Sequence, residues 1–187
     1  MLDVTQKNCV NGIDLDALTE VAEAVGQDSA KGMLAFRVCT EWTGQTRSET
    51  TIDSVVLGGE RIERRHKIVA DEPYELLGTD SAPNPQELLM SAVNACMMVG
   101  YVAQAAVRGI TLTTCRIEMA GELDLRGFLG LDASVPNGYR QLDYVVTLEG
   151  DGTDEQYAEI HAAVMATSPN FYNMNQTIEM NGRLQTR

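Results

Sequence analysis

The sequence predicts an α+β fold in which antiparallel strands surround one long, buried central helix. The segment 84–108 is the longest run without a loop signal, and helix-capping residues stand at both of its ends. The segment 33–70 alternates in polarity between glycine-containing turns, which indicates three antiparallel strands. The segment 115–184 adds two strands, a second helix and a last strand. The expected order is therefore β-β-β-α-β-β-α-β.

The central helix is expected to run from Asn84 to Arg108. Asn84 can cap the helix, Pro85 suits its first position, and Glu87 can reach back to the capping amide. Arg108 and the glycine after it mark the other end. Apolar residues on nearly all sides are typical of a helix buried on most faces. Hydropathy would also allow a membrane span, but the few polar residues and the many alanines favour a soluble core.

The remaining elements follow from polarity patterns and turn residues. An amphipathic helix is expected near the N-terminus, as an appendage formed by residues 1–31 in front of a domain formed by residues 32–187. The expected segments are the helix Ile13–Val25, the strands Met33–Thr43, Thr46–Leu57 and Arg61–Ala70, a strand from Cys115 to Leu125, the strand Tyr139–Glu149, a helix from Thr153 to Ser168, and the strand Asn175–Leu184.

Composition excludes several classes of function. A formal net charge of -13 argues against binding nucleic acid or an anionic membrane surface through basic contacts. The N-terminus lacks the apolar stretch of a secretory signal, so a cytoplasmic protein is expected. The four cysteines, spread along the chain, form no Cys-x-x-Cys motif and no paired histidine spacing, so neither a metal site nor a cofactor is expected.

Two features of the sequence allow only a limited interpretation. In the third strand Arg64 and His66 share a face with two isoleucines. They are either a snorkelling arginine and a hydrogen-bonded histidine at the core edge, or two residues near a pocket. His161, on the second helix, is expected to be a surface or edge residue rather than a catalytic base.

Three blocks of sequence resemble the OsmC/Ohr family, the osmotically inducible protein C and organic hydroperoxide resistance proteins. They are LLGTDSAPNPQELLMSAVNACMMVGYVAQAAVRGITL, GELDLRG and ATSPNFYNMNQTIEMNGRL. The resemblance covers roughly residue 32 to the end and implies an intertwined homodimer with thiol sites at the subunit interface. In active members a first cysteine attacks an organic hydroperoxide and a second, in a Cys-Pro context, resolves the sulfenic acid. An arginine and a glutamate position and activate the first thiol.

The family pattern transfers only in part. Cys96 matches the peroxidatic cysteine, but Ser168 stands at the resolving position and cannot form a disulfide. Gln86 occupies the glutamate position. Glu87 follows it and is rotated by about 100° around the helix, so it is not expected to substitute directly. Arg47 is the leading match for the arginine.

Alternatives remain open for two partners of Cys96. Arg37 and Arg64 are the other candidates for the arginine. A thiol in mid-helix gains nothing from the helix dipole, so its reactivity depends on such a nearby cation. Without one, Cys96 is a small core residue. Its sulfenic acid would be reduced by an external thiol or by Cys39 or Cys115.

Two functional hypotheses follow. The first is a thiol-dependent peroxidase with Cys96 as its single reactive cysteine, acting in oxidative stress defence on organic hydroperoxides. The second is a non-catalytic homodimer of the same fold that binds a small hydrophobic ligand and has lost the redox cycle. Ser168 and Gln86 favour the second hypothesis, and Cys96 favours the first.

Overall fold

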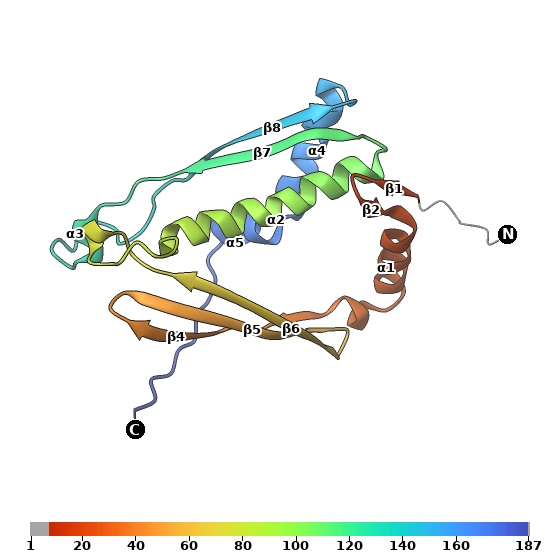
Figure 1. Ribbon diagram of the computed structural model, residues 1–187. Helices are drawn as coiled ribbons and strands as arrows, with labels where there is room; N and C mark the ends of the chain where they lie inside the picture. The colour runs from red at the N-terminus through yellow and green to blue at the C-terminus, as the bar shows by residue number, and fades with distance from the viewer. Residues whose placement is uncertain (1–7, 187) are drawn as a thin grey trace. The chain divides into compact units, whose positions relative to one another are not determined.

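The computed structural model describes residues 8–186. The chain forms two compact units, Met1–Ser91 and Ala92–Arg187, and the boundary between them falls inside the long helix α2, Pro85–Val107 (Figure 1). Each unit has its own sheet. The predicted boundary at residue 32 concerns the extent of the family domain and stays a prediction.

The N-terminal unit begins with a small hairpin. Strands β1 (Cys9–Val10) and β2 (Ile13–Asp14) are joined through Asn11 and Gly12, which both have positive φ angles, of 52° and 78°. Helix α1 (Leu15–Gln27) follows, and the Asp14 side chain caps it by accepting the Ala17 amide at 3.2 Å. The predicted helix is confirmed with a start two residues later. The 3-10 turn η1 spans Ser29–Gly32.

The sheet of this unit is organised around strand β5 (Arg47–Leu57). Strand β6 (Glu60–Ala70) pairs with it in antiparallel fashion along its length, and strands β3 (Leu34–Phe36) and β4 (Cys39–Gly44) pair with its two ends. The prediction of one strand over 33–43 is wrong, because the chain breaks between β3 and β4. The break faces the part of β5 where the register with β6 shifts, between Ile52 and Ser54.

Asp71 organises the loop between β6 and α2. Its side chain is buried and accepts hydrogen bonds from the hydroxyls of Thr46, Thr79 and Ser81, at 2.8, 2.5 and 2.8 Å. It also accepts the backbone amides of Thr79 and Ser81, both at 3.1 Å, and of Glu72 at 2.9 Å. These donors, the Thr79 hydroxyl first, hold the pKa of Asp71 far below its usual range. The loop, which includes η2 (Tyr74–Leu76), is thereby fixed ahead of α2.

The ends of α2 follow the sequence signals. The Asn84 side chain accepts the Gln86 amide at 2.7 Å, and Glu87 accepts the Asn84 amide at 2.8 Å, which is the predicted capping arrangement. At the other end Gly109 takes a φ of 71° and its amide bonds to Ala106. The predicted boundaries are thus confirmed to within one residue.

The C-terminal unit contains the rest of α2 and five further elements. They are β7 (Leu112–Ala120), the short helix α3 (Leu125–Phe128), β8 (Asp143–Gly150), α4 (Asp154–Thr167) and α5 (Pro169–Asn175). Strands β7 and β8 form an antiparallel pair beside α2 (Figure 1). Buried residues of α2 and α4 make the core, and Gly100 allows close packing: a Cβ there would lie 3.2 Å from the methyls of Val164.

Helix α2 buries one stripe of its surface in the single chain. Val93, Met97, Tyr101 and Ala105, spaced four residues apart, are buried with Ala106, whereas Val99 is 70% exposed. The expectation of burial on most sides is therefore wrong for one isolated chain. Among the described residues α2 is the single helix long and apolar enough to cross a membrane, a criterion that a core helix also meets.

The predicted final strand is also wrong. Helix α4 ends at Thr167 before the proline, as expected, but Ser168 and Pro169 then start helix α5, and residues 177–186 have no regular secondary structure. The alternating residues Ile178 and Met180 are 55% and 91% exposed. Alternation alone does not make a strand, because a strand also needs backbone pairing, and this segment pairs with none of the strands of the described chain. The strands β7 and β8 likewise end before Leu125 and begin after Tyr139.

Candidate thiol site and adjoining cavities

Cys96 and Ser168 lie side by side in the C-terminal unit. Cys96 is half-buried near the middle of α2, and Ser168 is 5% exposed between α4 and α5. The Ser168 hydroxyl donates a hydrogen bond to Cys96 Sγ over 3.6 Å. Because sulfur accepts long hydrogen bonds weakly when it is protonated, this contact matters most for a thiolate.

Local structure positions both residues. Ser168 is the capping residue of α5, and its oxygen accepts the Phe171 amide at 3.5 Å. Pro169 follows at the first helical position, which fixes the change of direction after α4. The Asn170 side chain donates to the carbonyl of Ala92 at 2.9 Å, one helical turn before Cys96. The start of α5 is therefore attached to α2 beside the thiol.

A cavity of about 410 Å³ reaches within one helical turn of each member of this pair, although neither Cys96 nor Ser168 is part of its lining. Val93 lies one turn before Cys96 on α2, and Phe171 lies one turn after Ser168, so both helices reach the cavity wall. Phe171 also makes an edge-to-face contact with Tyr144, at 6.3 Å between ring centroids. The lining residues are Val93, Met119, Tyr139, Arg140, Gln141, Leu142, Tyr144, Phe171, Met174 and Asn175. Such a cavity suits a small, largely apolar ligand.

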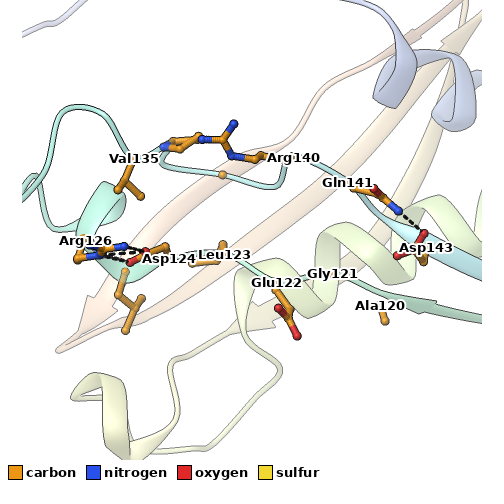
Figure 2. A pocket seen from close by; sticks show the side chains of 13 residues that line it. Ala120, Gly121, Glu122, Leu123, Asp124, Arg126, Val135, Arg140, Gln141 and Asp143 are labelled. Atoms are coloured by element: carbon orange, nitrogen blue, oxygen red, sulfur yellow. Dashed lines mark hydrogen bonds and ion pairs between the residues drawn. The ribbon is translucent and has the colours of Figure 1, made fainter.

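A second cavity, of about 970 Å³, lies between the end of β7 and the start of β8, and Figure 2 shows the side chains that line it. This cavity is rich in charge. Arg126 forms a two-pronged ion pair with Asp124, which lowers the pKa of that carboxyl to about 2. The Gln141 amide donates to Asp143 at 2.6 Å.

The three candidate arginines belong to the N-terminal unit. Arg47 is the first residue of β5 and donates to the Thr43 hydroxyl at 3.0 Å. Arg37, between β3 and β4, and Arg64, on β6, are exposed. His66 is exposed as well, so its interpretation as a core-edge residue is wrong for the described chain. Which arginine partners Cys96 stays a prediction.

The remaining candidate residues have clear local roles. Gln86 and Glu87 are exposed in the first turn of α2, where Glu87 takes part in capping. All four cysteines are free thiols, and Cys9 and Cys39 are exposed. Cys115 on β7 packs against the core, and burial raises the pKa of its thiol. Among residues 8–186 no group of three or more His, Cys, Asp or Glu is arranged to hold a metal ion.

Buried Tyr101 and half-buried His161 form a polar pair that the sequence did not predict. Tyr101 is fully buried on α2, and its hydroxyl lies 2.6 Å from Nδ1 of His161 on α4. Burial raises the pKa of Tyr101 well above its usual value. His161 is half-buried, which agrees with the expected edge position, but its hydrogen bond to Tyr101 was not predicted. A tyrosine four residues after a buried Met97 was the available signal, since a buried hydroxyl needs a partner.

Comparison with known proteins gives one family. A model described as OsmC-like protein matches residues 78–181. No curated protein matches the chain. Among solved structures, an OsmC-like protein from Mycoplasma pneumoniae is 13% identical, with a TM-score of 0.60 over 75% of this chain and 87% of its own. An OsmC-like protein of unknown function from Vibrio cholerae is 14% identical, with a TM-score of 0.53 over 75% of this chain and 93% of its own.

A third structure carries a functional name. It is an organic hydroperoxide resistance protein OsmC from Legionella pneumophila, 19% identical, with a TM-score of 0.46 over 75% of this chain and 88% of its own. The fold assignment depends on the first two structures and not on this one. At these identities structural likeness establishes the fold and leaves the activity to the chemistry of the site.

Proposed function

The chain belongs to the OsmC-like family, and from this membership we propose that it is a thiol-dependent peroxidase that reduces organic hydroperoxides through Cys96. The observation that supports the proposal most directly is the hydrogen bond from the Ser168 hydroxyl to Cys96 Sγ. A donor at this distance stabilises negative charge on sulfur, which the reaction needs. The neighbouring apolar cavity offers room for the organic part of a hydroperoxide.

The reaction proceeds in two stages. The Cys96 thiolate attacks the terminal oxygen of the hydroperoxide, the O–O bond breaks, and the sulfur becomes a sulfenic acid. The departing alkoxide takes up a proton and leaves as an alcohol. An external thiol then attacks the sulfenic sulfur and releases water, and a second thiol cleaves the mixed disulfide and restores Cys96.

Ser168 determines how the cycle is completed. A serine cannot form the disulfide that a resolving cysteine would, so the oxidised state must be reduced from outside or by Cys39 or Cys115. We favour an external thiol, because burial raises the pKa of Cys115 and reduces its thiolate fraction. The activating cation is expected to be Arg47, with Arg37 and Arg64 as the alternatives.

The proposal includes a cytoplasmic homodimer that acts in oxidative stress defence. Two exposed apolar surfaces support an interface with a second copy of the chain. Val99 on α2 is 70% exposed, and the C-terminal segment carries Met180 and Leu184, 91% and 89% exposed. Large apolar side chains that stay this exposed forgo the free energy of burial, which an interface would recover. Light scattering after size exclusion should give the mass of two chains, and a monomer over the accessible concentration range would remove the dimer from the proposal.

A second function has its own support. The chain could serve as a non-catalytic binding protein for a small hydrophobic ligand, because the apolar cavity is present whether or not Cys96 reacts. Ser168 at the resolving position and Gln86 at the glutamate position also favour a lost redox cycle. This alternative retains the dimer and predicts no oxidation of Cys96 during ligand binding.

The two functions are separated by trapping the sulfenic acid. The reduced protein is treated with one equivalent of cumene hydroperoxide in the presence of dimedone, and the intact mass is measured. A rapid adduct in the wild type that is absent in Cys96→Ser supports the peroxidase. An unmodified Cys96 under the same conditions supports the binding protein. Cys115→Ser serves as a control for oxidation at another half-buried thiol.

A further inference from the structure

Arg140 lies at the boundary of the two cavities and contributes to the lining of both. Apart from Glu122, the other charged or amide groups of these linings are already engaged. Arg126 pairs with Asp124, Gln141 bonds to Asp143, and Asn175 bonds to the Phe171 carbonyl at 2.9 Å. Within residues 8–186, Arg140 has neither a hydrogen-bond acceptor nor an ion-pair partner, and Figure 2 shows it apart from the Asp124–Arg126 pair.

The segment that carries Arg140 is held by close backbone packing. A Cβ on Gly127 would lie 2.2 Å from the Pro136 carbonyl oxygen, so the loop passes directly over this glycine. A Cβ on Gly121 would lie 2.4 Å from Leu142 and 3.0 Å from the Tyr139 ring. These contacts hold Tyr139 and Leu142, which flank Arg140 in the chain, against Gly121 just after the end of β7. The guanidinium thus belongs to a defined loop and not to a free tail.

Charge decides from which side an anion can approach Arg140. The larger cavity carries the carboxylates of Glu122, Asp124 and Asp143, which repel an anion there. The smaller cavity has no carboxylate in its lining, and apart from Arg140 and the amides of Gln141 and Asn175 its walls are aliphatic and aromatic. An anionic group is therefore favoured where Arg140 borders the smaller cavity. The rest of the ligand would extend along Val93, Met119 and Phe171 toward Cys96.

We propose that Arg140 is a specificity-determining residue of the smaller cavity and selects ligands that carry a carboxylate at one end of an apolar body. A guanidinium recognises a carboxylate through two parallel hydrogen bonds, and because Arg140 is exposed this pairing would be partly screened by water. The Tyr139 hydroxyl, beside Arg140 in the chain, is a further donor on the same lining. A volume of about 410 Å³ accommodates an aromatic acid of moderate size.

The carboxylate preference rests on the proposed function for the kind of substrate, but ligand binding can be measured without any peroxide reaction. If the chain is a peroxidase, its preferred hydroperoxides carry a carboxylate. If the chain is a binding protein, its preferred ligands carry a carboxylate. Binding is therefore measured both in the wild type and in Cys96→Ser, where no peroxide chemistry through Cys96 can occur.

The experiment compares phenylbutanoate with its methyl ester by isothermal titration calorimetry on the full-length protein. The acid should bind the wild type and Cys96→Ser about 10-fold more tightly than the ester, which corresponds to one partly screened ion pair. In Arg140→Gln the preference should fall to about 1, with ester binding unchanged. Arg116→Gln, which removes an exposed arginine paired with Glu118 on β7, should leave the preference intact.

Several results would overturn the inference. They are equal affinity for acid and ester in the wild type, no binding of either compound, or an acid preference that survives Arg140→Gln. Loss of the preference in Arg116→Gln as well would indicate a general charge effect and also overturn it. Arg140→Lys should restore part of the preference, because the charge returns without the two-pronged geometry.

Discussion

Cys96 and Ser168, separated by 72 positions in the chain, are joined by a hydrogen bond from hydroxyl to sulfur. A cysteine at the position of this serine would lie within reach of the Cys96 thiol. The contact also shows what has to change for a disulfide to form. The side chains of cysteine and serine differ in one atom, so the backbone around Ser168 already suits a second thiol.

The first prediction concerns Ser168→Cys. The new thiol should form a disulfide with Cys96 after one equivalent of organic hydroperoxide, since the two positions are already in contact. Nonreducing peptide mass spectrometry should identify the linked peptides, and turnover with a dithiol reductant should rise about 10-fold if resolution limits the wild type. Ser168→Ala is the matched control and should form no such link. A variant that keeps both thiols free after oxidation would contradict the prediction.

The second prediction concerns the hydrogen-bonded pair of Tyr101 and His161. Tyr101→Phe removes the hydroxyl that lies 2.6 Å from His161 and leaves the imidazole nitrogen without its partner. The free energy of unfolding should fall by about 1–3 kcal/mol. Tyr144→Phe is the control, because its hydroxyl donates only to the weak acceptor Met165 Sδ, and it should cost less. Chemical denaturation measures the free energy of unfolding of both variants. Equal decreases in the two variants would contradict a special role of the Tyr101 hydroxyl.

The third prediction is a pH dependence from Asp71. Its pKa in the folded chain is held far below the value of about 3.9 expected when unfolded. A depressed folded pKa gives stability that is fully present above the unfolded pKa and is lost as the pH falls below it. The melting temperature of Asp71→Asn should therefore lie several degrees below that of the wild type near neutrality.

The same difference should narrow below about pH 4, where the wild-type carboxylate begins to lose its advantage. Thermal unfolding followed by circular dichroism across this range measures it. Asp80→Asn is a suitable control, because Asp80 is an exposed residue of the same loop. A gap between Asp71→Asn and the wild type that does not change with pH would mean that the effect comes from shape and not from charge.

The fourth prediction concerns the loop that carries Arg140. In Gly127→Ala the added Cβ would meet the Pro136 carbonyl at 2.2 Å, so backbone must move, and stability should fall by about 1–3 kcal/mol. Gly138→Ala, in the same loop with open space around it, should change stability little. Denaturant unfolding compares the two. If Arg140 acts as proposed, Gly127→Ala should also weaken the acid preference of the smaller cavity.

The sequence alone determined the local elements with strong signals. The capping residues Asn84 and Glu87 placed the start of α2, the residue before Pro169 ended α4, and the turn glycines separated β5 from β6. These signals involve residues at most a few positions apart, so their energetics are set within one turn of chain. Composition and motif order were likewise sufficient for the family.

Only the tertiary structure decided which distant residues meet. It placed the Ser168 hydroxyl on Cys96, paired Tyr101 with His161, and left Arg140 unengaged beside an apolar cavity. It also showed that the alternation around Ile178 makes no strand, and that α2 buries one face in a single chain. Periodicity records which residues avoid water, but pairing depends on the partners that folding brings within reach.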